Sequence, residues 1–267
     1  MEWWEAFWLG LTQGLTEFIP VSSSGHLEIM QQLLGGRSED FHYFLEFINI
    51  GTLLALIIYY RKRIWRILQD IFVRHKFSLA LNIVITCIPA VVFGLLLGNV
   101  IESAPFFSSF ATIAAMMAIV GILMILVDKL PHMGKLRDET QLDKKRALYI
   151  GLAQVIALIP GSSRSGTTML AGRLVGLRNK AAADYSFLAS IPIMCGVVAK
   201  SLLSSASQAY IVSNLGLFLL ANCVAFVVGS LAIRWALKFL RRDDALKYFG
   251  WYRVALAALI AIFLLLQ

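Results

Sequence analysis

Residues 106–127 read FFSSFATIAAMMAIVGILMILV, a continuous apolar stretch without one charged side chain. About 20 such residues are needed for a helix to cross the hydrocarbon core of a bilayer. The stretch therefore predicts a membrane-spanning helix, and with it a fold in which lipid is the main solvent. It lies near the middle of the 267-residue chain, and similar stretches stand on both sides of it.

Five further apolar runs have the length or composition of membrane spans, namely 44–60, 79–98, 181–203, 215–236 and 251–266. The whole chain is 59% hydrophobic and 15% charged, whereas soluble domains are nearer half apolar and a quarter charged. The predicted fold is therefore an all-α polytopic membrane protein with six transmembrane helices. The net charge of +8 comes from basic residues in short loops, a pattern typical of membrane topology rather than of nucleic-acid binding.

The chain contains an internal duplication. Residues 10–13 (GLTQ) precede IPVSSSG at 19–25, and residues 151–154 (GLAQ) precede IPGSSRSG at 159–166. Three of the predicted spans follow each copy. We expect a first repeat at 1–130, a cytoplasmic linker at 131–145 and a second repeat at 146–267.

The loop charges predict that the two repeats are inverted. Lys and Arg gather at 61–76, 129–146 and 238–247, which places these segments in the cytoplasm. Residues 99–105 and 204–214 carry neither, which places them outside. The three spans of one repeat therefore run opposite to those of the other, with both chain termini outside.

Two segments remain, 3–34 and 146–177, each broken by Pro and a Ser/Gly cluster. Each has to return to the side it entered from if the neighbouring spans are to keep their orientation, so we expect two re-entrant helix pairs. Broken helices at matching positions of inverted repeats point to a binding site near the bilayer midplane. Non-helical backbone at that depth is tolerated where it is buried in protein or lines a wet cavity.

The chemistry at the point where the two breaks would meet favours an anion. Ser22 and Ser162 occupy predicted N-cap positions, so two helix N-termini would converge with their positive dipole ends. Arg164 adds a guanidinium suited to bidentate phosphate binding. The alternatives are that the serines only cap helices and that Arg164 forms a structural ion pair, for example with Glu17. The candidate phosphate-binding set is Ser22, Ser162, Ser163, Arg164, Ser165, Gly166 and Thr168.

The first break carries complementary groups. Gln13 and Glu17 are four residues apart and share one helix face. Glu17 could bind a divalent cation or act as a base, and Ser23 or His26 could be the nucleophile. The alternative for His26 is a polar side chain with a purely structural partner. The candidate catalytic residues are Glu17, Ser23, His26 and Arg164, and the candidate metal ligands are Gln13 and Glu17.

Two other functions fit parts of this pattern. Inverted repeats with broken helices are also transporter architecture, so a transporter or flippase of an anionic lipid or solute is the main alternative. Transport alone would not need the Glu, Ser and His side chains opposite an Arg. Residues 24–26 imitate the Ser-Gly-His element of the lipid phosphatase superfamily, but no Arg-x5-His-x3-Asp block follows Arg164, so we reject that family.

Residues 13–26 (QGLTEFIPVSSSGH) and 160–168 (PGSSRSGTT), with a softer match at 48–55, resemble the bacterial undecaprenyl-diphosphate phosphatases, the UppP/BacA bacitracin-resistance family. The resemblance covers nearly the whole chain. It implies a bacterial inner-membrane enzyme that removes the terminal phosphate of the C55 polyprenyl diphosphate, regenerates the lipid carrier for peptidoglycan synthesis and confers bacitracin resistance. It also implies a divalent cation, Mg²⁺ or Ca²⁺.

The resemblance also implies roles for individual residues. The family's acidic pair falls on Gln13 and Glu17, so Glu17 alone supplies a carboxylate, and its Ser and His fall on Ser23 and His26. The phosphate-binding loop falls on Ser163, Arg164 and Thr168. Attack by Ser23 with His26 as base, and direct attack by His26, both remain open. So do the side to which the site opens, the lipid chain length and the oligomeric state, a homodimer being one arrangement.

Overall fold

The computed structural model describes residues 1–35, 41–130 and 136–266, and these residues are almost entirely helical without a β-strand. Within this described part of the chain, six helices are long and apolar enough to cross a membrane, which agrees with the predicted number of spans. Large apolar side chains such as Leu95, Leu203 and Leu265 are 78%, 83% and 86% exposed. Such apolar surfaces are stable in contact with lipid. The chain is an all-α, multi-pass membrane protein.

Each half of the chain contains a pair of short helices followed by three long ones. The first half contains α1 (Trp3–Thr16), α2 (Ser23–Leu33), α3 (Phe41–Phe47), α4 (Asn49–Phe72), α5 (Ser78–Ser103), α6 (Pro105–Ser108) and α7 (Phe110–Lys129). The second half contains the 3₁₀ turn η1 (Glu139–Gln141), α8 (Lys144–Val155), the 3₁₀ turn η2 (Ile156–Leu158), α9 (Arg164–Leu174), α10 (Asn179–Leu203), α11 (Ser205–Ser213), α12 (Leu215–Phe239) and α13 (Ala245–Leu265).

Several helix ends differ from the sequence prediction. The prediction ended the first span at residue 60, but α4 continues to Phe72 through residues assigned to a basic loop. Arg and Lys are good helix formers, and their long side chains reach the interface from a helix as well as from a loop. Likewise α13 begins at Ala245 rather than at residue 251. Part of the predicted linker, 131–135, lies outside the described residues.

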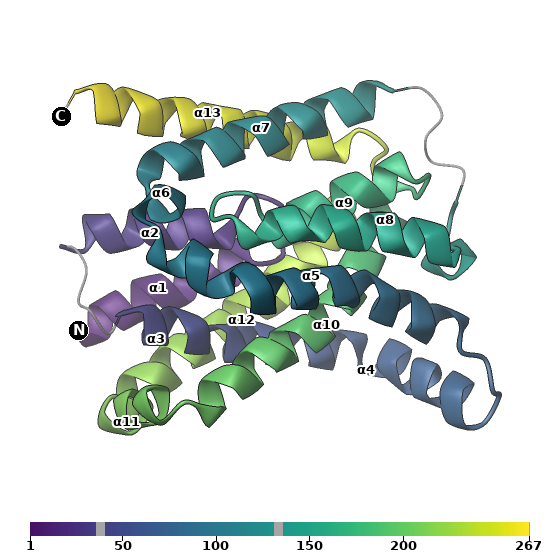
Figure 1. Cartoon of the computed structure of the whole chain (residues 1–267), viewed down its shortest axis with the longest axis horizontal. Coiled ribbons are helices and arrows are strands. Elements are labelled where there is room, and N and C mark those ends of the chain that lie inside the picture. The colour runs from purple at the N-terminus through teal and green to yellow at the C-terminus, as the bar shows by residue number, and fades with distance from the viewer. Residues whose placement is uncertain (36–40, 131–135, 267) are drawn as a thin grey trace.

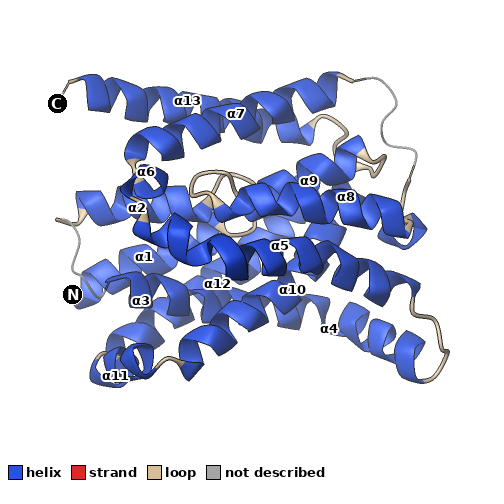
Figure 2. Ribbon diagram, viewed as in Figure 1, coloured by secondary structure: helices blue, strands red, loops and turns tan. Residues whose placement is uncertain are grey.

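The two short helix pairs enter the molecule from opposite ends (Figure 1). Both chain termini lie at the end from which α1 enters, whereas α8 begins at the other end. The loops joining α1 to α2 and α8 to α9 are the tan segments that meet in the middle of the molecule in Figure 2. This places the two breaks close together at mid-depth.

The two halves exchange packing partners. Helix α1 packs along α12 of the second half, and α8 packs along α5 of the first. A Cβ atom at Gly10 would lie 2.5 Å from the carbonyl oxygen of Ala221, and one at Gly151 would lie 2.7 Å from that of Thr86. Helices in lipid associate through such close backbone approach at small residues. Each broken helix pair is therefore held by a span of the other half.

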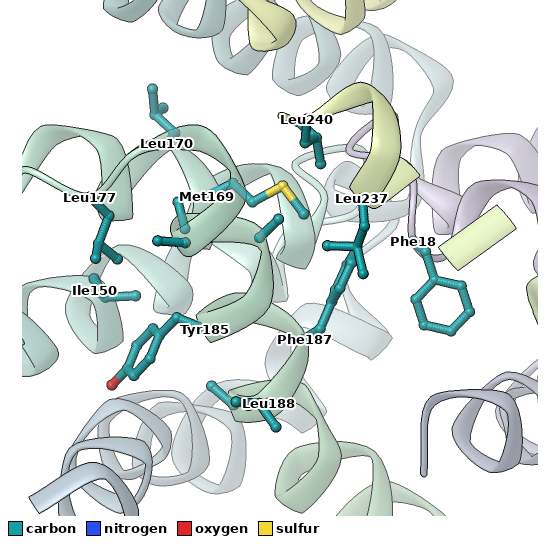
Figure 3. Packing of buried hydrophobic residues seen from close by; sticks show 14 of the residues in the cluster. Phe18, Ile150, Met169, Leu170, Leu177, Tyr185, Phe187, Leu188, Leu237 and Leu240 are labelled. Atoms are coloured by element: carbon teal, nitrogen blue, oxygen red, sulfur yellow. The ribbon is translucent and has the colours of Figure 1, made fainter. Parts of the chain in front are cut away.

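The largest buried apolar cluster includes residues of α9 and reaches Phe18 of the first break (Figure 3). Phe18 and Phe187 meet edge to face, with ring centroids 5.6 Å apart at 88°. The buried Tyr185 hydroxyl donates to the carbonyl oxygen of Asn82 at 2.9 Å. Met169 of α9 is fully covered in this cluster. The packing fixes α9, and with it the first residue of that helix, Arg164.

Candidate active site

The helices that follow the two breaks begin in the same way. Ser22 is the N-cap of α2 and Ser163 the N-cap of α9, with φ angles of 79° and 71°. Each hydroxyl accepts from the backbone N–H of the glycine three residues later, Gly25 at 3.3 Å and Gly166 at 3.1 Å. A left-handed conformation costs a non-glycine residue about 1–2 kcal/mol. Its presence at both positions shows that the breaks are structural equivalents.

The cap of α9 was predicted at Ser162, and this prediction was wrong by one residue. The hydroxyl of Ser162 donates to the carbonyl oxygen of Ile159 at 2.5 Å, and Ser163 takes the cap. From the proline to the N-cap, the second break contains one more residue than the first, so a match made from the prolines is shifted by one. In the structure, Ser23 and Arg164 are the first residues of their helices.

Residues that follow both breaks bind the side chain of Glu17. Its side chain is only 7% exposed and forms an ion pair with Arg164 through Oε1, as the alternative reading of Arg164 proposed. Its Oε2 atom accepts from the Ser23 hydroxyl at 2.8 Å and from the Gln13 amide at 3.1 Å. A buried carboxylate needs such partners. The structure thus brings Gln13, Glu17, Ser23 and Arg164 together.

The Gln13 amide also contacts two side chains of α4, both within the softer match at 48–55. Its amide nitrogen lies 2.8 Å from Oδ1 of Asn49 and 3.4 Å from Oγ1 of Thr52. Among the described residues, no three His, Cys, Asp or Glu side chains gather to hold a metal ion. The donors around Glu17 are instead one carboxylate, amides and hydroxyls. This set suits a hard cation that takes its remaining ligands from substrate phosphates.

His26 lies apart from the Ser23 hydroxyl. Its Nδ1 atom is 2.7 Å from the carbonyl oxygen of Ser22, and its Nε2 atom is 2.7 Å from the hydroxyl of Tyr252. The expected hydrogen bond from Ser23 to His26 is therefore absent from the structure, because Ser23 donates to Glu17. The chain brings a carboxylate, not an imidazole, to this hydroxyl.

The remaining residues of the predicted phosphate loop mostly bind the loop itself. The Thr168 hydroxyl donates to the Arg164 carbonyl oxygen at 2.7 Å and lies 2.5 Å from the Ser186 hydroxyl. The Ser165 hydroxyl is 3.2 Å from that of Ser163. A Cβ at Gly166 would lie 2.9 Å from the terminal methyl of Met124, so a side chain there would require Met124 to shift. Arg164 is the charged group of the loop.

Arg253 is a further residue at the breaks, and the sequence analysis missed it. It is fully buried and donates to backbone carbonyl oxygens of both breaks, at Pro20 (3.3 Å), Gly161 (2.8 Å) and Ser162 (3.0 Å). The signal was available: an arginine inside the apolar run 251–266 is costly in a membrane and so marks a functional or structural site. Arg253 joins the two loops through one guanidinium.

The fold and this constellation define a class: a multi-pass membrane protein of two inverted halves with a polar, anion-compatible site between two re-entrant helix pairs. The family model described as Bacitracin resistance protein BacA matches residues 6–259, and the chain belongs to this family.

Relatives match over their full length. The chain is 37% identical to an undecaprenyl-diphosphatase of Paenarthrobacter aurescens, covering 100% of this chain and 98% of the relative. It is 38% identical to one of Pseudarthrobacter chlorophenolicus with the same coverage, and 34% identical to one of Pseudomonas aeruginosa, covering 97% and 94%.

Proposed function

We propose that this protein is an undecaprenyl-diphosphate phosphatase, which converts undecaprenyl diphosphate and water to undecaprenyl phosphate and phosphate. The observation that carries the proposal is the convergence of Ser23 and Arg164 on the two oxygens of Glu17. Phosphoryl transfer depends mainly on positioning and on neutralising charge. A hydroxyl beside a carboxylate, with a guanidinium and two helix N-termini, supplies both. Membership of the BacA family supports the same activity.

In the mechanism we propose, Arg164 and the N-termini of α2 and α9 bind the diphosphate. Oγ of Ser23 bonds to the terminal phosphorus while the bond from that phosphorus to the bridging oxygen breaks. The Ser23 proton passes to Oε2 of Glu17, and the lipid monophosphate leaves with the bridging oxygen. Water then bonds to the phosphorus of the phosphoserine while the bond from phosphorus to Oγ breaks. Oγ takes its proton back from Glu17, and the phosphate leaves with the protons of the water.

The divalent cation is also a proposal. Gln13 and Glu17 would hold Mg²⁺ or Ca²⁺ together with oxygens of the substrate. A bound cation would neutralise phosphate charge. Removing it with a chelator should abolish phosphate release, and adding back one cation should restore it. Full activity after exhaustive chelation would count against this part of the proposal.

We further propose that the protein resides in the bacterial inner membrane with both termini outside, where it recycles the carrier for peptidoglycan synthesis and confers bacitracin resistance. The support is the charge pattern of the loops and the family. Its partners are the polyprenyl diphosphate and membrane lipids, and a homodimer stays a prediction. Cysteine accessibility at each terminus and cross-linking in membranes test topology and oligomeric state.

The decisive experiment measures phosphate release from a polyprenyl diphosphate by purified protein in detergent. Wild type should be active, and Glu17→Ala and Arg164→Ala should lose nearly all activity while remaining folded. A transporter or flippase would show no release with any divalent cation. That result would favour the alternative, which neither the geometry at Glu17 nor the relatives favour.

A further inference from the structure

Helix α13 contributes two consecutive residues to the breaks. Arg253 binds the loop carbonyls, whereas Tyr252 reaches the histidine of the first break. The Tyr252 hydroxyl lies 2.7 Å from Nε2 of His26, and the two rings are stacked with centroids 5.7 Å apart at 8°. The hydroxyl therefore contacts the Nε2 edge of the imidazole, and the two rings lie nearly parallel.

The hydrogen bonds determine the tautomer of a neutral His26 ring. Nδ1 lies 2.7 Å from the carbonyl oxygen of Ser22, and a carbonyl can only accept, so Nδ1 carries the proton. Nε2 is then an acceptor, and the Tyr252 hydroxyl has to donate to it. The phenol and the backbone carbonyl together leave one orientation for the ring.

We infer that Tyr252 is a positioning residue of the phosphatase site, which holds His26 as the Nδ1-protonated tautomer in a fixed plane. With its Nε2 lone pair engaged, His26 is not poised to attack phosphorus, and Ser23 remains the nucleophile with an adjacent base. Of the other charged groups, Arg253 lies on the same helix next to Tyr252 and points to the loop carbonyls. The kinetic part of this inference rests on the proposed function, and the part concerning the hydrogen bond does not.

The test separates the hydroxyl from the ring. Tyr252→Phe removes the donor and keeps the stacked ring. Tyr248→Phe is the matched control, one helical turn earlier, where the hydroxyl faces Asp244 and Arg242 instead. Nitrogen-15 NMR of histidine-labelled protein reports the four histidines, and His26→Gln assigns the His26 signal.

We expect Tyr252→Phe to move the Nε2 resonance of His26 toward that of an unbonded imine nitrogen. It should lower kcat by about fivefold to tenfold, as expected from one hydrogen bond, with KM within about twofold. Tyr252→Gln, which returns a donor without the ring, should recover part of the lost kcat. Tyr248→Phe should change neither quantity.

An unchanged His26 resonance in Tyr252→Phe would overturn the inference, as would a kcat equal to that of the control. If Tyr252→Phe unfolds at a lower temperature than Tyr248→Phe, the Nε2 resonance of His26 and the partial recovery of kcat in Tyr252→Gln still test the inference. If wild type releases no phosphate, the proposed function fails by itself. The NMR measurement then tests the bond from Tyr252 to His26 independently.

Discussion

Ser23 and Arg164 hold the same position in the two halves of the chain, and both side chains end on one carboxylate. Each is the first residue of the helix after a break. Ser23 donates to Oε2 of Glu17, and Arg164 donates to Oε1. Equivalent points of the two halves thus carry a hydroxyl and a guanidinium. The site is asymmetric although its scaffold is symmetric.

Ser23→Ala should lower kcat by roughly a thousandfold or more, because it removes the atom that receives the phosphoryl group. Ser24→Ala is the matched control: the Ser24 hydroxyl accepts from the Gly161 N–H at 3.5 Å and does not contact Glu17. Rapid quenching with a substrate labelled on the terminal phosphate should trap label on Ser23. Label on His26 would contradict the mechanism.

The two glutamines of the repeats should respond differently to mutation. Gln13 orients Glu17, whereas its counterpart Gln154 is 2% exposed and its amide oxygen and nitrogen have no described partner. An unpartnered buried amide costs about 1–3 kcal/mol. We expect Gln154→Met to be neutral or to raise the thermal unfolding temperature, and Gln13→Met to reduce phosphate release. Equal losses of activity in both variants would show that the halves share the chemistry.

Gly151→Ala should destabilise the protein by about 1–3 kcal/mol, because the new methyl group would overlap the backbone of Thr86. Gly196→Ala is the control, since no atom lies within 4 Å of a Cβ at that position. Thermal unfolding in detergent measures both. A Gly151→Ala protein as stable as Gly196→Ala would indicate that α8 and α5 are further apart than described.

Arg253 should contribute mainly to stability. Arg253→Met leaves the carbonyl oxygens of both breaks without their donor and should cost about 3 kcal/mol or more. Arg253→Lys keeps a charge but fewer donors, so its unfolding temperature should lie between those of wild type and Arg253→Met. The exposed Arg241→Met is the control. An unfolding temperature of Arg253→Met equal to wild type would remove the proposed link between the loops.

Features encoded by neighbouring residues could be predicted from the sequence. The six spans follow from apolar runs. The ion pair between Glu17 and Arg164, which are 147 residues apart, was named only as an alternative role of Arg164, on the ground that isolated charges are costly in a membrane. Helix ends were misplaced where charged helix formers continue a span, as in α4. Tyr252 was missed because its partner, His26, is 226 residues away. The apolar pattern of the last span does not show which of its residues face a loop near the other end of the chain.

The bond from Arg253 to the carbonyl oxygen of Pro20 joins residues 233 positions apart. During synthesis, helices α1 and α2 therefore leave the ribosome long before Arg253, which binds the loop between them, has been made. Until then, the carbonyl oxygen of Pro20 lacks the donor that Arg253 supplies in the folded chain. The contacts between the two breaks are complete only when α13 has inserted into the membrane. A chain cut short before α13 would carry Glu17, Ser23 and Arg164 and still lack the residue that ties their loops together.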